Sequence, residues 1–431
     1  MVKKKNTNPW TPKDEGSHYP ITREWWTYET IFKTKEDKKK YNLMLIMAYN
    51  LEIPSCFFQY TLFNIDANKC IIREDIDDDI KKFIHKKNKL ELKYKENFVK
   101  GLYPNYTLHL ENKEKEFNID IEFDAKSFPH WIAQDITNGE LPIGLNFYKY
   151  GYIPNCDIKG NFKLKNKKYD LEGFGYVEHV WGDWSYQRPF KKFSNLKKTF
   201  STYLNLGKWW LSEHNPKIPD KLKFASENNI FGYDWAWGVF DNSWSFFYGN
   251  ILFWLSEGPG FGVFSLTKDG KKYLEFSDFN FKYNKVTYVK EYDIYFATDF
   301  EIFGRLKDEK IHLRFFIDKK SHEYIDPFQK QGFYKAFILS EMPAKVEGEY
   351  KDKNGIVKLC GDCKMMPLRQ PSVLGHNALS FEFIKPPKGV GIKIDFNSHY
   401  LKKRIKTNLL LSPKLSFNFN VKKLKKEDFE F

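Results

Sequence analysis

The sequence shows no sign of disulfides, membrane spans or a secretory signal. Its five cysteines are few and odd in number for 431 residues, which argues against a disulfide framework and suits a reducing compartment. The longest apolar runs, such as 251–255 and 409–411, are far shorter than the ~20 residues that cross a bilayer. Residues 1–10 are basic and polar, without the apolar segment of a signal peptide. We therefore expect a cytoplasmic protein.

Helix signals are also weak. Alanine, the strongest helix former, is scarce, and we find neither an amphipathic helix of several turns nor the strand–helix alternation of parallel α/β proteins. Aromatic residues, in contrast, make up 18% of the chain, with 41 Phe, 26 Tyr and 12 Trp. Aromatic and β-branched residues favour strands, so the composition predicts a mostly β protein with ring-rich cores.

The formal net charge is +14, but its distribution argues against nucleic acid as a partner. Lysines occur in short clusters with acidic residues between them, and no nucleic-acid-binding motif accompanies them. We therefore predict no nucleic-acid partner. Weak association with an anionic membrane surface is the more plausible use of this charge in a protein that serves a lipid-like ligand.

Strand-like alternation recurs along the chain and suggests two domains. Residues 117–123 alternate apolar and polar side chains, as a half-buried strand does, and similar runs follow with turn residues between them. At roughly 150 residues per domain, the length predicts two domains or more. Between the two predicted domains the alternation stops, and the sequence is rich in Pro, Lys, Asn and Ser. We expect an N-terminal β domain at 15–185, a connecting insertion at 186–230 and a C-terminal β domain at 231–431.

The first cluster of chemical interest lies near the start of the chain. On a strand, Glu24, Trp26 and Tyr28 project to one face, and Trp25 and Thr27 to the other. A carboxylate among rings is costly to ionise, so its pKa would rise and it could hold a proton near neutral pH. The commoner alternative is a glutamate paired with a nearby arginine or lysine beside core tryptophans.

The second cluster ends the N-terminal domain. On a strand, His179, Trp181 and Asp183 share one face, which places an imidazole, an indole and a carboxylate side by side. These residues form a candidate acid–base surface. The commoner alternative is a buried histidine bonded to a backbone carbonyl or to Asp183.

The third cluster opens the C-terminal domain. Tyr233, Trp235 and Trp237 form an aromatic stripe at strand spacing, and Tyr248 and Asn250 follow in the next aromatic run. Such a stripe is more often core than ligand site. Inside a barrel wide enough for a ligand, the same residues would line the cavity.

Motifs for common cofactors are missing. Cys360 and Cys363 form a lone CxxC without a second pair, and His179 has no nearby histidine at ligand spacing. We find no phosphate-binding loop, dinucleotide fingerprint, HExxH or GxSxG. We predict no metal and no cofactor.

Taken in order, the three clusters resemble the carotenoid 1,2-hydratase (hydroxyneurosporene synthase) and AttH-like family of the lipocalin-like (calycin) superfamily. The likeness covers roughly residues 15–260 and rests on 24–26, 178–182 and 234–237. This chain departs from the family in the inserted Thr27, in Glu178 where aspartate is commoner, and in a longer connection. It also has Asn250 where hydratase members carry a proton-donating aspartate, and an amide cannot serve as that acid.

The resemblance implies an all-β fold of two tandem antiparallel lipocalin-like β-barrels and activity on a lipophilic alkene. We expect a cofactor-independent hydratase, isomerase or cyclase for an isoprenoid- or lipid-like hydrophobic small molecule. The alternative is a non-catalytic binder or carrier of such a molecule. The predicted site residues are, for proton transfer, Glu24, Glu178, His179 and Asp183, and, for the substrate-facing wall, Trp26, Tyr28, Trp181, Tyr233, Trp235, Tyr248 and Asn250.

Overall fold

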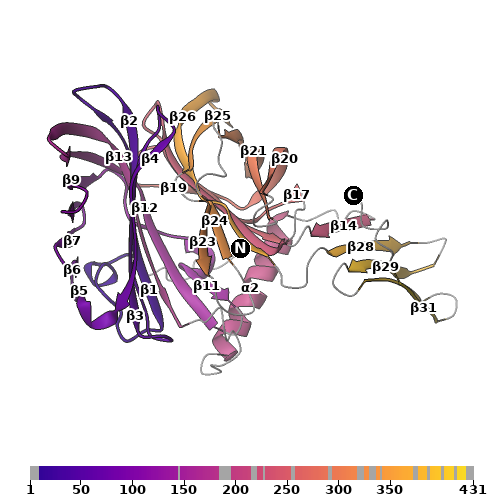
Figure 1. Ribbon diagram of the computed structural model, residues 1–431. Helices are drawn as coiled ribbons and strands as arrows, with labels where there is room; N and C mark the ends of the chain where they lie inside the picture. The colour runs from indigo at the N-terminus through magenta and orange to yellow at the C-terminus, as the bar shows by residue number, and fades with distance from the viewer. Residues whose placement is uncertain are drawn as a thin grey trace.

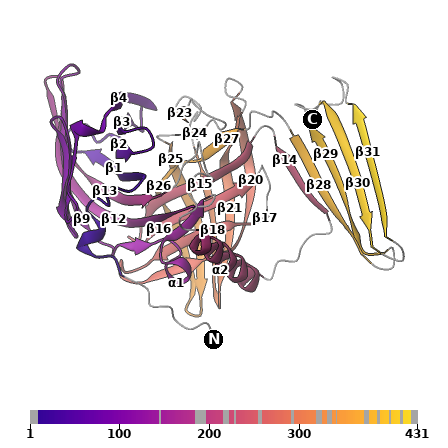
Figure 2. The same ribbon diagram turned by 90° about the horizontal axis from the view of Figure 1, so that it is seen from below.

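The protein consists of two thirteen-stranded antiparallel sheets, each curled into a nearly closed barrel, and a separate five-stranded sheet (Figures 1 and 2). The prediction of an all-β protein with two tandem antiparallel barrels is confirmed. The computed structural model describes residues 9–143, 146–183, 196–214, 221–226, 229–253, 258–289, 294–317, 325–329, 336–339, 342–371, 377–385, 389–398, 402–411 and 415–423.

The first barrel is a continuous antiparallel sheet in the order β4-β3-β2-β1-β13-β12-β9-β8-β7-β6-β5, with β10 and β11 paired to β12. Two 3-10 helices, η1 (Pro12–Asp14) and η2 (Ile80–Lys82), and the short helix α1 (Gln134–Thr137) accompany it. The strands are β1 (Arg23–Thr34), β2 (Lys40–Asn50), β3 (Ser55–Asn64), β4 (Lys69–Asp79), β5 (Phe83–His85), β6 (Leu90–Tyr94), β7 (Asn97–Leu102), β8 (Asn105–Asn112), β9 (Phe117–Ala125), β10 (His130–Trp131), β11 (Glu140–Ile143), β12 (Asn146–Leu164) and β13 (Lys167–Gly182).

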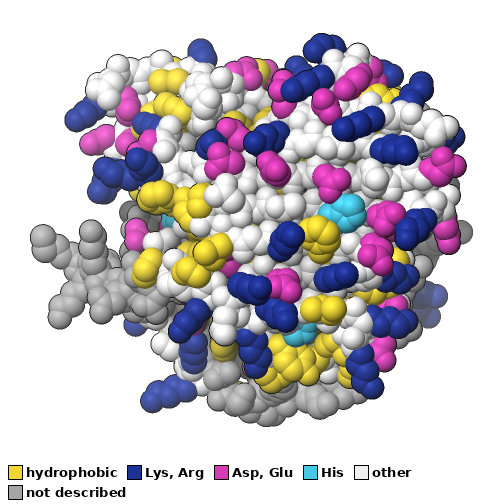
Figure 3. Space-filling model, turned by 90° about the vertical axis from the view of Figure 1, so that its left-hand side faces the viewer, with side chains coloured by type: hydrophobic (Ala, Val, Ile, Leu, Met, Phe, Trp, Pro, Cys, Tyr) yellow, Lys and Arg dark blue, Asp and Glu magenta, His cyan; other side chains and the backbone are white. Residues whose placement is uncertain are grey.

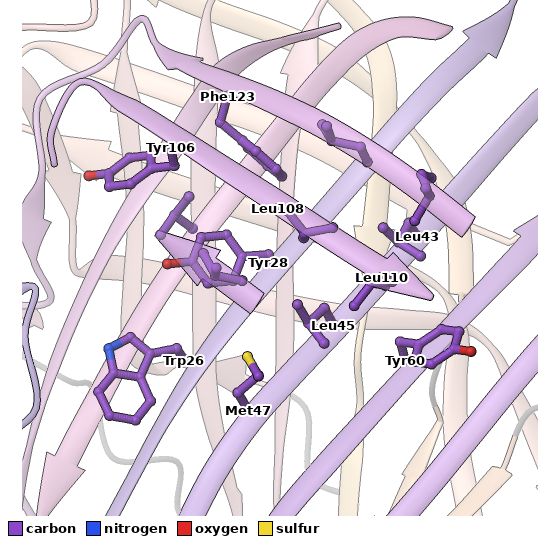
Figure 4. Packing of buried hydrophobic residues seen from close by; sticks show 14 of the residues in the cluster. Trp26, Tyr28, Leu43, Leu45, Met47, Tyr60, Tyr106, Leu108, Leu110 and Phe123 are labelled. Carbon is purple, nitrogen blue, oxygen red and sulfur yellow. The ribbon is translucent and has the colours of Figure 1, made fainter. Parts of the chain in front are cut away.

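The alternation read from the sequence places the core of this barrel. Along β9, the apolar positions from Phe117 to Phe123 are buried and most of the polar residues between them are exposed. Figure 4 shows Trp26 and Tyr28 of β1 beside Tyr106 and Leu108 of β8, in the interior of the barrel. Side chains at every second position therefore fill the interior.

The second barrel has the order β17-β20-β21-β22-β25-β26-β15-β16-β18-β19, and β23, β24 and β27 branch from it. Its interior is dominated by phenylalanine rings. The strands are β15 (Asn229–Phe240), β16 (Ser245–Phe253), β17 (Gly258–Pro259), β18 (Phe261–Thr267), β19 (Tyr273–Phe276), β20 (Asp278–Val289), β21 (Ile294–Leu306), β22 (Glu309–Phe316), β23 (Ile325–Gln329), β24 (Ala336–Leu339), β25 (Met342–Asp352), β26 (Gly355–Met365) and β27 (Leu368–Pro371).

The end of the chain does not join the second barrel. A separate sheet has the order β14-β28-β29-β30-β31 and stands apart from both barrels in Figures 1 and 2. The sequence analysis had expected the C-terminal barrel to run from 231 to 431. The strands of the separate sheet are β14 (Lys221–Ser226), β28 (Asn377–Ile384), β29 (Gly391–Ser398), β30 (Lys403–Leu410) and β31 (Ser416–Lys423).

The insertion between the barrels contains a helix that the sequence analysis did not find. Helix α2 (Leu196–His214) is 19 residues long, so the expectation of no helix of several turns was wrong. Its apolar residues recur at helical spacing, but they stand in a stretch rich in Pro, Lys, Asn and Ser that we took for a connection. Residues 186–195, 215–220 and 227–228 of the predicted insertion lie outside the described residues. In the part of the chain that the structure describes, no helix combines the length and apolarity needed to cross a membrane.

Charges on the first barrel are mixed. Figure 3 shows Lys and Arg interleaved with Asp and Glu over the visible, described part of this face, with small groups of hydrophobic side chains between them.

The two barrels pack against each other through β1 and β13, which are buried on both faces. A core of rings from both barrels fills the interface. It contains a buried ion pair: Lys364 Nζ of β26 lies 3.1 Å from Glu29 Oε2 of β1, and both side chains are fully buried. The indole of Trp237 donates to the same carboxylate oxygen at 2.6 Å. Opposite charges thus join the two barrels where water is excluded.

We predict that Lys364→Met destabilises the protein by about 3–5 kcal/mol, because it leaves the Glu29 carboxylate buried without its cation. The measurement is the free energy of unfolding in urea. The double variant Glu29→Gln with Lys364→Met should recover part of the loss. Lys358→Met is the matched control, since Lys358 pairs with Glu349 on the surface and such pairs contribute less than about 1 kcal/mol. Equal effects of the two lysine variants would contradict the prediction.

Candidate active site

Residues 10–18, here called the plug segment, cross the end of the first barrel at which β1 begins. The Ser17 N–H donates to the Lys86 carbonyl at 2.7 Å. The Tyr103 N–H donates to both carboxylate oxygens of Glu15, at 3.2 and 3.1 Å. These bonds tie the plug to the β5–β6 and β7–β8 turns, and the plug thereby brings Trp10 and His18 to the barrel end.

Glu24 is fully buried beneath the plug and accepts hydrogen bonds from three residues. The donors are Ser17 Oγ at 2.9 Å, the His18 backbone N–H at 2.9 Å, and the rings of His18 and His179 through Nδ1 and Nε2, each 2.9 Å from Oε1. Burial by itself raises the pKa of Glu24, but the bonds from His179 and His18 outweigh it and lower this pKa to about 2. The expectation that Glu24 holds a proton near neutral pH was therefore wrong.

His179 lies opposite Trp26 in the β1–β13 register, with its side chain on the inner face. Its Nδ1 lies 2.7 Å from the Asp14 carbonyl oxygen. A carbonyl only accepts, so Nδ1 carries a hydrogen, and an attractive contact from Nε2 to the Glu24 carboxylate requires a second one. Burial outweighs the opposing effect of the Glu24 carboxylate and lowers the pKa of His179. A proton between Nε2 and Oε1 would satisfy both atoms of the pair.

Indole rings surround the His179–Glu24 pair. The Trp26 ring stacks on His179 at 4.6 Å between centroids, and the Trp181 ring lies 4.6 Å from His179 and parallel to His18 at 3.8 Å. Trp10 of the plug lies 6.4 Å from His179. Aromatic faces stabilise positive charge, so this arrangement suits an imidazolium and a cation formed beside it.

A second buried carboxyl lies a short way along the plug. Glu15 is only 3% exposed. Burial raises its pKa to about 7, against the lowering effect of hydrogen bonds from Tyr103, Trp10 and Tyr106. A carboxyl group with this pKa exchanges its proton near neutral pH, which the sequence analysis had expected of Glu24.

Two further predicted residues, Tyr28 and Asp183, have other surroundings. Tyr28 lies on the same face of β1 as Glu24, inside the barrel, where its ring packs 5.8 Å from Phe123. Asp183 accepts bonds from the N–H and hydroxyl of Thr22, at 3.1 and 2.6 Å. These bonds join the end of β13 to the residue before β1.

Glu178 lies on the opposite face of β13, between the barrels. It accepts bonds from the hydroxyls of Tyr150 and Tyr176 and from the indole of Trp25 at 2.8 Å. Trp235 of the second barrel donates to the Tyr150 hydroxyl at 2.7 Å. Burial raises the pKa of Glu178 against these bonds. Glu178 and Trp235 thus share an interface network, which is separate from the Glu24–His179 pair.

The remaining predicted wall residues belong to the second barrel. Tyr233 packs against the interface core. Tyr248 is buried inside the barrel, and Asn250 accepts from the Phe261 N–H at 2.9 Å. The same interior holds a buried ion pair between Arg369 and Asp234, at 2.8 Å. The predicted residues are therefore dispersed, and among them only Glu24, His179, Trp26 and Trp181 form one cluster at the barrel end.

Sequence reasoning missed the plug residues. His18 stands six positions before Glu24, in a Gly-, Ser- and Pro-containing stretch typical of a turn. Only the folding of that stretch over the barrel end shows which ring meets the carboxylate. The run of chemistry-bearing residues at 14–18 was the one signal that could have identified it.

The fold and the site define a tandem β-barrel protein with a His–Glu–His cluster at one barrel end. No family model matches the sequence, and no curated protein matches it. Its fold is similar to that of an AttH-like protein from Nitrosomonas europaea, with a TM-score of 0.56 at 10% identity over 84% of this chain and 99% of that chain. It is also similar to kievitone hydratase from Nectria haematococca, with a TM-score of 0.51 at 10% identity over 85% and 94%. At such identities the likeness concerns the fold alone.

The same cluster could hold a metal ion. One ligand atom from each of His18, Glu24 and His179 lies within 4.8 Å of the others, so the sequence argument that His179 lacks a histidine partner was wrong. The Asp14 carbonyl accepts from His179 Nδ1 and so orients the ring, as the hydrogen-bond acceptor behind a metal-bound histidine does.

We retain the prediction of no metal, because hydrogen bonds within the cluster already occupy these donor atoms. Elemental analysis of the purified protein is the measurement. One equivalent of zinc or iron, removed by chelation and absent from Glu24→Gln, would contradict the prediction.

The two buried carboxyls should make stability depend on pH in opposite directions. The pKa of Glu24 is lowered to about 2, so its contribution is present above pH ~4.5 and disappears as the pH falls toward 2. The pKa of Glu15 is raised to about 7, so stability decreases as the pH rises from ~4.5 through 7. Each effect amounts to at most about 3 kcal/mol.

Urea unfolding of Glu24→Gln and Glu15→Gln between pH 3 and 8 is the measurement. Glu24→Gln should lose part of the fall in unfolding free energy at acid pH. Glu15→Gln should lose part of the fall in unfolding free energy toward neutral pH. Unchanged pH profiles in both variants would refute the assignment.

Proposed function

We propose that this protein is a cofactor-independent hydratase, isomerase or cyclase that acts on an apolar isoprenoid- or lipid-like alkene. The observation that carries the proposal is the 2.9 Å contact between His179 Nε2 and Glu24 Oε1, which lies among three indole rings. A proton at this contact is a general acid in surroundings that favour a cation.

The reaction begins with transfer of the His179 Nε2 proton to one carbon of the double bond. The π electrons form the new C–H bond, and the neighbouring carbon becomes a carbocation. Trp26 and Trp181 present ring faces to positive charge at this position, and the Glu24 carboxylate balances it. Because the pKa of Glu24 is about 2, Glu24 stays ionised throughout and its role is to orient and charge the imidazole.

The cation then has three outcomes. Water adds and loses a proton to give an alcohol, or a neighbouring carbon loses a proton to give an isomeric alkene. Alternatively, a second double bond of the substrate attacks and closes a ring, and a carbon beside the new cation then loses a proton. In each case one proton returns to His179, so the catalyst is regenerated without a redox partner. Glu15, with a pKa of about 7, is a second proton carrier at the same barrel end.

The rival function is binding without chemistry. In a carrier, the rings would line a ligand site and Glu24 would only hold the plug in place. The free thiols of all five cysteines are compatible with the cytoplasmic location that we propose for either function. Extraction of the purified protein with organic solvent, followed by mass spectrometry, would identify a co-purifying ligand and so provide a substrate for the test below.

We predict that Glu24→Gln and His179→Gln each reduce turnover of the identified substrate by about 10²–10⁴-fold. His179→Gln removes the proton donor, and Glu24→Gln removes the carboxylate that favours the charged imidazole. Ligand affinity should change far less, because size and polarity are approximately kept. The measurement is single-turnover rate beside equilibrium binding. Glu172→Gln is the control, because this surface glutamate pairs only loosely with Lys35 at 3.8 Å.

Wild-type turnover in both site variants would refute the assignment of the acid, and Glu15 would be the next residue to replace. Tight ligand binding without any turnover by the wild type would favour the carrier instead.

A further inference from the structure

Helix α2 presents large apolar side chains to solvent. Phe200 is 63% exposed and Leu211 56%, and Leu196, Tyr203 and Leu204 are each more than 40% exposed. The side turned toward the protein carries the buried Thr199 and half-buried side chains such as Asn205 and Leu206. The usual arrangement of a surface helix is therefore reversed.

The exposed side chains form one continuous stripe. At 3.6 residues per turn, positions 196, 200, 203, 204 and 211 fall within an arc of about 100°. We call this set the α2 stripe. It runs along the helix for four turns, and each of its side chains is more than 40% exposed.

Positive charge borders the stripe. Lys197 and Lys208 are exposed and lie at its edge, while Lys198 is turned toward the protein, where it pairs with Glu140 at 2.9 Å. The helix sequence contains three lysines and one acidic residue, Glu213. An apolar stripe with a basic border is the pattern of helices that lie in the headgroup region of an anionic bilayer.

The helix also lies near the candidate active site. It packs against α1 and β11, and Figure 2 shows it beside α1. Trp131, which shortly precedes α1, has its ring 5.6 Å from Trp181 and 4.7 Å from Trp10 of the plug segment. The ring shell of the site is thus connected to the part of the surface that carries α2.

We propose that α2 is a membrane-docking helix, whose stripe inserts between the headgroups of an anionic lipid bilayer while Lys197 and Lys208 contact lipid phosphates. The apolar area of the α2 stripe favours a lipid bilayer over a second copy of the chain as the occupant. Five side chains, each about half exposed, offer roughly 400 Å² of apolar surface, about half of what one partner contributes to a standard protein interface. A single convex helix suits a soft bilayer, and the net charge of +14 adds attraction to it. The proposal does not depend on the chemistry at Glu24.

The test is sedimentation of the full chain with vesicles of phosphatidylcholine containing ~30% phosphatidylserine, or of phosphatidylcholine alone. The wild type should bind the anionic vesicles and lose most of this binding in high salt. The double variant Phe200→Ser with Leu204→Ser should bind at least tenfold more weakly. Lys197→Gln with Lys208→Gln should cost about 25-fold, at about fivefold per lysine.

Phe303→Ser with Ile356→Ser is the matched control, because both residues are exposed apolar side chains on the second barrel. It should bind as the wild type does, and circular dichroism should show all variants folded. Glu24→Gln should also bind normally, so failure of the proposed chemistry and failure of membrane docking remain distinguishable.

Three results would overturn the proposal. The first is wild-type protein that does not bind anionic vesicles, and the second is equal binding by the stripe variant and the control. The third is a dimer in sedimentation velocity that the stripe variant abolishes, which would assign the stripe to contact between two copies of the chain.

Discussion

The Glu24 carboxylate imposes the constraint on which the rest of the site depends. A fully buried carboxylate is tolerated only when its oxygens are hydrogen bonded. Ser17 and His18 provide bonds from the plug, and His179 provides another from β13. The same hydrogen bonds therefore close the barrel end, orient the imidazole and favour its protonated form. Removal of any donor weakens all three effects.

Strand alternation divides the polar groups of the first barrel between two places. Neighbouring residues point to opposite faces, so His179 enters the barrel end while Glu178 enters the interface, and Glu24 and Glu29 separate in the same way. A strand with one buried face has room for a buried carboxylate network on that face alone. Because β1 and β13 are buried on both faces, each carries two, and the interface network includes the ion pair to Lys364 of the second barrel.

Much of the architecture was predictable because alternation is local. The two barrels and the shared inner face of Glu24, Trp26 and Tyr28 follow from period-2 patterns within single strands. The low pKa of Glu24 was not predictable, since it depends on His18 and His179, which reach the carboxylate from separate segments. Helix α2 was missed because its helically spaced apolar residues stand in a stretch rich in Pro, Lys, Asn and Ser, which is typical of a connection. The final sheet was missed because its strands alternate as well as barrel strands do.

The separate sheet joins two distant parts of the chain. Its strand β14 precedes the whole second barrel in sequence, yet it pairs with β28, which follows that barrel. During synthesis β14 emerges with no partner, and it stays unpaired until the entire barrel and residues 377–384 have left the ribosome. The order of assembly is thus set by the topology: the first barrel completes early, the second closes next, and the sheet that connects its entry and exit forms last.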